Sequence, residues 1–262
     1  MRIALLRSDP NQRPDPADRT EHAQFVRLDG ARAYPFDAAP WLGGREAAEP
    51  RAWVARDLLC PVRPTKIVCI GRNYAAHARE LGHDVPSEPL LFLKPPSSLL
   101  DPAGVVVLPP ESARVEHEAE LVVVIGRRAK NVAREHALGH VFGYSCACDV
   151  TARDLQRKDV QFTRAKGFDT FCPIGPWIET ELDPGAASVR CRVNGATRQD
   201  GNCALMVFDV PTLVAYVSRM MSLEPGDVIL TGTPEGVGPL VAGDSLEVEV
   251  SGIGTLALRI GA

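Results

Sequence analysis

Strand and turn patterns constrain this chain more than any other feature of its sequence. Residues 245–260, SLEVEVSGIGTLALRI, alternate apolar and polar side chains on both sides of a Gly-containing turn. A period of two places the apolar side chains on one face of a strand, so this segment predicts a hairpin with one buried face. Two more hairpins are predicted at residues 24–36 and 190–199, where Asp-Gly and Asn-Gly supply preferred turns. The chain is therefore expected to be mainly β.

Helices are expected to be few and short. One is predicted to begin near Pro211, which suits a first helical turn, and to end before Pro225. Two shorter helices are predicted at 74–81 and 131–138. The helix that begins near Pro211 has four apolar side chains on one face, namely Leu213, Val217, Met220 and Met221.

The chain length allows one large domain with a small appendage. Residues 45–64 are rich in Pro, Arg and Ala and carry little strand pattern, as expected of a connector. We therefore predict a small β-rich N-terminal domain at residues 1–62 and a larger, mostly β domain at residues 63–262.

Composition excludes several classes of function. The net charge is −4 and no basic stripe is present, which argues against nucleic acid as a partner. No apolar run is long enough to cross a membrane, and the apolar part of the N-terminus is too short for a signal peptide. The seven cysteines are scattered and odd in number. We expect them to be buried free thiols in a cytoplasmic protein.

The most informative local pattern is a row of carboxylates. Glu116, Glu118 and Glu120 alternate directly before the apolar run 121–125, so they would share one face of a strand. The alternative is a strand end that is still in water. Asp149 supplies a second acidic element, and hard divalent cations prefer oxygen ligands. We predict a Mg²⁺ or Mn²⁺ site formed by Glu118, Glu120 and Asp149, with Glu116 either outside the ligand set or exposed.

Three further residues could perform chemistry. His77 and Glu80 are neighbours on a predicted helix, and a carboxylate beside an imidazole favours its use as a base. The alternative is two exposed polar side chains. Lys166 lies in an apolar, turn-rich segment, where it would neutralise an anion or be a solvated loop residue. The Gly-rich turn 229–239 lacks the Gly-Lys-Ser/Thr of a nucleotide P-loop, but its amides and hydroxyls could hold a carboxylate.

Together these segments resemble the fumarylacetoacetate hydrolase family, in particular its acylpyruvate hydrolases and hydroxy-dienedioate isomerases and decarboxylases. The resemblance runs from about Lys66 to the C-terminus. It comprises six motifs in order: GRNYAAHARE, EPLLFLKP, EHEAEL, DVTARDLQ, RAKGFDTFCPIGPW and LTGTPEGVG. It implies a mixed β-sandwich roll with few helices, which forms a homodimer. Cys148 stands where many members have Asn, and Phe162 where many have Trp.

The resemblance also implies residue roles. The metal ligands would be Glu118, Glu120 and Asp149. The catalytic residues would be His77, Glu80 and Lys166. The substrate would be bound by Arg72, Arg153, Gln156 and Thr233.

The implied activity is divalent-metal-dependent hydrolysis of a C–C bond in a 2,4-dioxo acid of the acylpyruvate or fumarylpyruvate type, which yields pyruvate and a carboxylic acid. One alternative is an isomerase or decarboxylase of a 2-oxo or 2-hydroxy-diene dicarboxylate, including oxaloacetate. A catalytically silent dicarboxylate-binding protein is a third possibility. Residues 76–88 are also expected to act as a lid, because a short helix is marginally stable alone.

Overall fold

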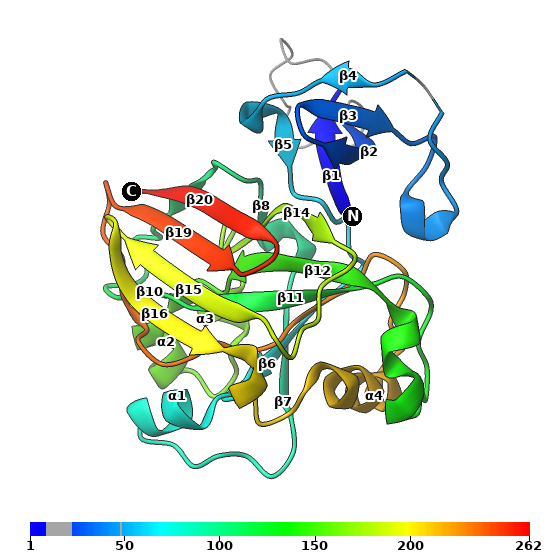
Figure 1. Cartoon of the computed structure of the whole chain (residues 1–262). Helices are drawn as coiled ribbons and strands as arrows, with labels where there is room; N and C mark the ends of the chain where they lie inside the picture. Colours follow the sequence, from blue (N-terminus) through cyan, green and yellow to red (C-terminus); the bar gives the residue numbers. More distant parts are fainter. Residues whose placement is uncertain (9–22, 48) are drawn as a thin grey trace.

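The computed structural model describes residues 1–8, 23–47 and 49–262, which form a mainly β protein (Figure 1). Residues 9–22 and 48, which belong to the predicted N-terminal domain, lie outside the described residues. The first ten strands are β1 (Arg2–Arg7), β2 (Ala23–Asp29), β3 (Arg32–Pro35), β4 (Arg51–Ala52), β5 (Leu58–Leu59), β6 (Ile67–Gly71), β7 (Leu90–Lys94), β8 (Leu99–Leu100), β9 (Val105–Val107) and β10 (Val115–His117). The others are β11 (Ala119–Ile125), β12 (Val141–Cys148), β13 (Thr151–Ala152), β14 (Cys172–Glu179), β15 (Ser188–Val193), β16 (Ala196–Asn202), β17 (Val228–Leu230), β18 (Gly238–Pro239), β19 (Ser245–Val250) and β20 (Gly254–Gly261).

The helices are short, as predicted. The α-helices are α1 (Ala75–Glu80), α2 (Arg153–Lys158), α3 (Thr163–Lys166) and α4 (Val210–Met220). The 3₁₀ helices are η1 (Pro40–Leu42), η2 (Ala55–Asp57), η3 (Pro96–Ser98), η4 (Arg134–His140) and η5 (Cys203–Leu205). The helix predicted at 131–138 is thus a 3₁₀ helix that begins three residues later. Asn131 has a φ of 54°, a left-handed conformation that a right-handed helix excludes.

Strand β11 is the centre of the large sheet, whose strand order is β4-β3-β2-β1-β14-β12-β11-β17-β6-β7. All seven of its residues are buried. Alternate side chains enter different cores: Leu121, Val123 and Ile125 join one cluster, whereas Val122 and Val124 join another. The unbroken apolar run 121–125 is therefore explained by burial on both faces.

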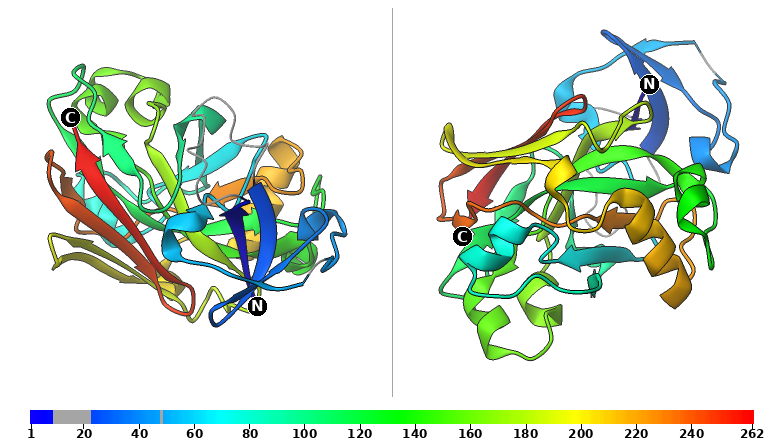
Figure 2. Two further views of the ribbon diagram at one scale, coloured as in Figure 1. Left: turned by 90° about the horizontal axis from the view of Figure 1, so that it is seen from above. Right: turned by 60° about the horizontal axis from the view of Figure 1, so that its bottom comes forward.

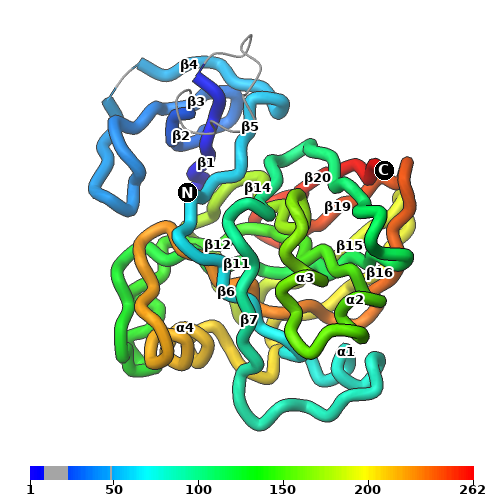
Figure 3. The backbone as a smooth tube through the Cα atoms, turned by 180° about the vertical axis from the view of Figure 1, so that it is seen from behind, coloured from blue at the N-terminus to red at the C-terminus, as the bar shows by residue number. Residues whose placement is uncertain are grey.

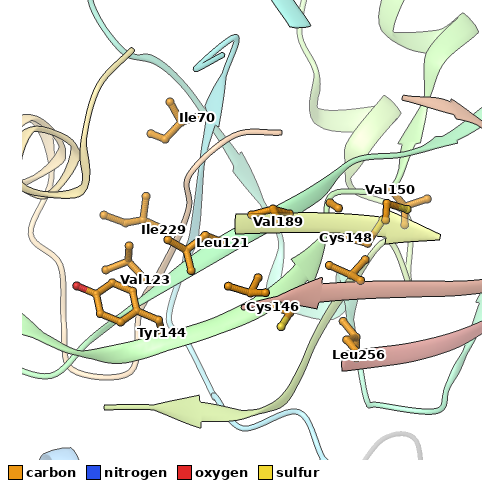
Figure 4. Close-up of a cluster of buried hydrophobic side chains, with 14 of the residues drawn as sticks. Ile70, Leu121, Val123, Tyr144, Cys146, Cys148, Val150, Val189, Ile229 and Leu256 are labelled. Carbon is orange, nitrogen blue, oxygen red and sulfur yellow. The ribbon is translucent and has the colours of Figure 1, made fainter. Parts of the chain in front are cut away.

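A second sheet, in the order β16-β15-β19-β20-β9, covers one face of the large sheet. Figure 4 shows the interface: Val189 of β15 and Leu256 of β20 lie with Leu121 and Cys146 of the large sheet in one cluster. The three predicted hairpins are confirmed as the pairs β2–β3, β15–β16 and β19–β20. Two views from other directions show this layered arrangement (Figure 2).

A third, three-stranded sheet, β13-β10-β18, packs against α2 and α3. Figure 3 shows that α1 lies on the same side of the molecule as these two helices. On the other side of the molecule, α4 packs against η4. The strands β1–β5 form the upper part of the molecule in Figure 1, and β1 pairs with β14. The N-terminal strands therefore extend the large sheet, and the division into two domains at residue 62 stays a prediction.

All seven cysteines are buried thiols outside any disulfide bond, in agreement with the sequence. Burial raises the pKa of several of these thiols, including Cys146, and so favours their uncharged form. None of the helices among the described residues is long and apolar enough to cross a membrane.

Candidate metal centre

The predicted carboxylates meet where two sheets join. Glu118 lies between β10 and β11, Glu120 lies on β11, and Asp149 directly follows β12. The antiparallel pairing of β11 with β12 places Ala119 opposite Cys148, and Asp149 N donates to Glu118 O at 2.8 Å. Ligand oxygens of the three side chains lie within 4.8 Å of one another, and all three residues are buried. The structure therefore brings the predicted ligands together.

Cationic side chains surround Glu118. Lys166 Nζ donates to Glu118 Oε2 at 2.9 Å and to Asp149 Oδ2 at 2.7 Å, and Arg153 donates to Glu118 Oε1. Burial alone would raise the pKa of Glu118, but the charges of Lys166 and Arg153 outweigh burial and lower it. Glu118 is thus ionised, and Lys166 remains protonated.

Glu116 lies outside the ligand cluster, which agrees with one of the two alternatives predicted for it. Glu116 is buried, so the other alternative, an exposed position, is wrong. Arg153 Nε donates to Glu116 Oε2 at 2.7 Å, and Arg114 Nε donates to Glu116 Oε1 at 2.6 Å. Arg153 therefore links Glu116 to Glu118. Because two guanidinium groups balance its charge, Glu116 can be buried without a metal ion.

Glu120 has a different environment. Among the described residues, no Lys, Arg or His forms an ion pair with Glu120. Its carboxylate accepts a hydrogen bond from Gly232 N, which lies 2.6 Å from Oε2. Burial and the charges of Asp149 and Glu118 raise the pKa of Glu120 well above its ordinary value. A buried acidic group without a cation, beside two other carboxylates, fits a hard divalent cation such as Mg²⁺ or Mn²⁺.

Lys94 is a residue that the sequence analysis missed. It ends strand β7 and is buried, and its Nζ donates to Asp149 Oδ1 at 2.5 Å and to Val150 O at 3.2 Å. Lys94 and Lys166 thus hold opposite oxygens of Asp149 and fix its orientation. The quoted motif EPLLFLKP contains Lys94, but nothing in the local pattern indicates a partner 55 residues away.

His77 and Glu80 also come together. On α1, His77 Nδ1 lies 3.3 Å from Glu80 Oε2, and His77 is buried. Both oxygens of Glu80 also accept from Gly236 N, at 3.0 and 3.2 Å. Gly236 has a φ of 94°, and a Cβ atom at this position would lie 2.1 Å from Arg198 O. The Gly-rich turn after β17 therefore holds the carboxylate that orients the imidazole.

One cavity of about 320 Å³ joins the carboxylate cluster to this pair. Eight of the ten predicted site residues line it: Arg72, His77, Glu118, Glu120, Arg153, Gln156, Lys166 and Thr233. The other two, Glu80 and Asp149, contact lining residues. Its apolar wall includes Phe92 and Phe162, whose rings meet edge to face at 5.6 Å.

Thr233 and Gln156 already have partners within the protein. Thr233 Oγ1 donates to Ala119 O and accepts from Gln199 Nε2, at 2.8 and 2.7 Å. Gln156 Oε1 accepts from Arg153 at 2.6 Å, which leaves its amide nitrogen to donate to a ligand. Gln199 is another residue that the sequence analysis missed. Its side-chain oxygen accepts from Ala119 N at 3.0 Å and so joins β16 to β11.

A mainly β fold with a buried carboxylate cluster, open to a cavity that also holds a His–Glu pair, defines a class of candidate metal-dependent enzymes. The family model described as "Fumarylacetoacetate (FAA) hydrolase C-terminal" matches residues 66–261. The chain belongs to the fumarylacetoacetate hydrolase family, which confirms the resemblance and the implied fold.

Named relatives represent several reactions. The chain is 46% identical over 197 residues to a mitochondrial oxaloacetate decarboxylase of Dictyostelium discoideum. The matched region covers 72% of this chain and 90% of the relative. It matches a 2-hydroxyhepta-2,4-diene-1,7-dioate isomerase structure from Mycobacterium marinum at 37% identity and a TM-score of 0.87, over 100% of this chain and 98% of that one. It also matches a fumarylpyruvate hydrolase from Pseudomonas aeruginosa in complex with Mn²⁺ and pyruvate at 35% identity and a TM-score of 0.72, over 77% and 91% of the two chains.

Proposed function

We propose that this chain is a divalent-metal-dependent enzyme that interconverts the keto and enol forms of a small 2-oxo dicarboxylate, with oxaloacetate as the first candidate. The observation that carries the proposal is the shared cavity, in which Glu118 and Glu120 of the carboxylate cluster face the same space as His77. The relative at 46% identity is named as an oxaloacetate decarboxylase, and it supports oxaloacetate as the substrate over the acylpyruvates that the sequence favoured.

In this proposal Glu118, Glu120 and Asp149 hold the cation. When bound, the cation supplies a Lewis acid that stabilises negative charge on the 2-oxo oxygen of the substrate. Glu80 Oε2 accepts the Nδ1 proton of His77, which leaves Nε2 free to remove a proton from C3 of the substrate and to return it. Phe92 and Phe162 exclude water on the apolar side.

The His77–Glu80 pair separates the possible oxaloacetate reactions. Decarboxylation breaks the C3–C4 bond and releases CO₂, so its bond-breaking step needs an electron sink but no base. Tautomerisation needs a group that removes and returns the C3 proton. A buried imidazole oriented by a carboxylate meets that need, and it therefore favours the tautomerase reaction over decarboxylation alone.

Hydrolysis of an acylpyruvate is the second candidate, since the same imidazole can take a proton from water. The hydroxide would add to the distal carbonyl, and cleavage of the adjacent C–C bond would release the enol of pyruvate and a carboxylic acid. The likeness to the fumarylpyruvate hydrolase, whose structure holds Mn²⁺ and pyruvate, supports this candidate.

A substrate panel tests both candidates. The decay of enol-oxaloacetate absorbance and the release of pyruvate from oxaloacetate, acetylpyruvate and fumarylpyruvate are measured with Mg²⁺, Mn²⁺ or EDTA. We expect metal-dependent enol decay that falls about 100-fold in His77→Gln and Glu80→Gln. If pyruvate is released from fumarylpyruvate faster than enol-oxaloacetate decays, the second candidate, acylpyruvate hydrolysis, would be the main activity. Full tautomerase activity in both variants would refute the proposed base.

A further inference from the structure

The cavity has two ends with different charge. At its buried end, Lys166 and Arg153 are each paired with carboxylates. At its open end lie Arg72, His83 and the exposed Arg157. Within the described part of the chain, neither Arg72 nor Arg157 has a salt-bridge partner, and the carboxylates that line the cavity are Glu118 and Glu120. Two guanidinium groups without counter-charges therefore border the open end.

The backbone fixes the position of Arg72. Arg72 has a φ of 57°, a conformation that side chains other than Gly rarely adopt. The next residue, Asn73, is fully buried; its Nδ2 donates to Phe208 O and Thr231 O at 3.0 and 2.8 Å, and its Oδ1 accepts from Phe208 N at 2.8 Å. These bonds hold the chain in the strained conformation beside the cavity. Strain that is maintained in this way is typical of functional sites.

The other two residues come from different elements. Arg157 lies on α2. His83 lies three residues after the last residue of α1, and its backbone N donates to Ala78 O at 2.9 Å. Partial burial and the nearby charge of Arg72 lower the pKa of His83, so at neutral pH its ring is an uncharged hydrogen-bonding group. The open end thus combines the two permanently charged guanidinium groups of Arg72 and Arg157 with the uncharged ring of His83.

We propose that Arg72 and Arg157, together with His83, bind the distal carboxylate of the substrate and select dicarboxylates over monocarboxylates. This inference rests on the proposed function, in which the 2-oxo acid end of the substrate occupies the carboxylate cluster. Guanidinium groups suit this role because they bind carboxylates through two parallel hydrogen bonds. Arg157 was not among the residues predicted from the sequence.

Two ligands that differ only at the distal end provide the test. N-oxalylglycine carries an oxalyl group and a distal carboxylate, whereas N-methyloxamate carries the same oxalyl group and no distal carboxylate. Their binding to the full-length protein in Mn²⁺ is measured by titration calorimetry. We expect wild type to bind N-oxalylglycine at least about tenfold more tightly, because each charge-assisted hydrogen bond favours the bound state.

Variants then assign the effect to residues. Arg157→Gln and Arg72→Gln are each expected to weaken N-oxalylglycine roughly tenfold and to leave N-methyloxamate unchanged. Lys158→Gln removes the same charge from the neighbouring exposed position, which does not line the cavity, and should change neither affinity. Arg157→Lys keeps the charge but not the fork-shaped donor, so it should recover only part of the loss.

The outcomes separate this inference from the proposed function. If wild type binds neither ligand in the presence of Mn²⁺, the proposed 2-oxo acid site fails and the inference fails with it. If wild type binds both ligands equally well, and the arginine variants do the same, the distal site is refuted while the proposed function stands. A loss in Lys158→Gln equal to that in Arg157→Gln would also refute it, because the effect would then be one of general surface charge.

Discussion

Glu118 and Glu120 lie two residues apart, yet their surroundings have opposite consequences for mutation. Glu118 neutralises the buried cations Lys166 and Arg153, whereas Glu120 has no cationic partner among the described residues. Removing one member of a buried ion pair leaves an uncompensated charge and costs about 3–5 kcal/mol. The contacts of Glu118 therefore predict a clear loss of stability in Glu118→Ala.

We therefore predict that Glu120→Gln keeps or raises the melting temperature of the metal-free protein, because Gln cannot ionise at a position where burial and two neighbouring carboxylates disfavour a charge, and it retains an acceptor for Gly232 N. The same variant should lose most of the rise in melting temperature that Mn²⁺ causes in wild type. Calorimetric scans in EDTA and in Mn²⁺ measure both effects, with Glu118→Gln as the matched comparison. A full Mn²⁺ response in Glu120→Gln would exclude Glu120 from the ligands.

At the scale of the element, α1 ends in a Schellman motif. His83 N donates to Ala78 O at 2.9 Å, Gly82 N donates to Arg79 O at 3.0 Å, and Gly82 has a φ of 74°. Because Gly82 needs this positive φ, we predict that Gly82→Ala destabilises the helix end by about 1 kcal/mol and weakens ligand binding. Gly243→Ala is the control, because Gly243 has a φ of 97° and does not line the cavity.

The lid at residues 76–88 stays a prediction about motion in solution. The structure shows α1 formed and held through Glu80 by Gly236 N, and such a short helix depends on these tertiary bonds. We expect amide hydrogen exchange in 76–88 to slow when oxalate binds to the Mn²⁺-loaded protein. High protection before oxalate is added, unchanged afterwards, would show a fixed wall instead.

Asp209 caps α4 and links the stability of that helix to pH. Its Oδ1 accepts from Thr212 N at 3.0 Å, and Arg134 of η4 pairs with its other oxygen. Partial burial raises the pKa of Asp209, but the bonds from Thr212 and Arg134 outweigh it and lower that pKa. The stabilisation is therefore complete above the unfolded-state pKa, near pH 4, and is lost as the pH falls through the lower folded-state value.

We predict that Asp209→Ala costs about 1 kcal/mol at pH 7. Asp209→Asn should cost less, because the amide oxygen can still cap the helix. Urea unfolding at pH 7 and at pH 3 measures both variants. The deficit of Asp209→Ala relative to wild type should shrink at the lower pH, and a deficit that grows there would contradict the assignment.

At the scale of the whole molecule, the predicted homodimer remains to be measured. Strand β9 is an edge of the five-stranded sheet, and Val105 and Val107 on it are 44% and 45% exposed. An open edge with apolar side chains is normally covered in the assembled protein. Light scattering at micromolar concentration should give twice the chain mass of 28.3 kDa. A mass of one chain would contradict the prediction.

The sequence predicted what is encoded locally. The hairpins follow from alternation and turn dipeptides, and the Glu118–Glu120 spacing follows from the period of a strand. Lys94 and Gln199 could not be found in this way, because their partners lie 55 and about 80 residues away and are selected only by packing. The choice between the two alternatives for Glu116 could not be made for the same reason, since Arg153 reaches it from another element.

The pairing of β1 with β14 has a consequence for biosynthesis. Arg2 and Ile3 lie opposite Glu179 and Ile178, so β1 cannot pair with this neighbour until about 175 further residues have been made. The parallel pairing of β6 with β17 imposes a still later requirement, because Ile67 lies opposite Val228. Such distant pairings slow folding and leave apolar strand edges unpaired on the nascent chain. We therefore expect the large sheet to close late in synthesis, after the shorter-range pairing of β1 with β2 has formed.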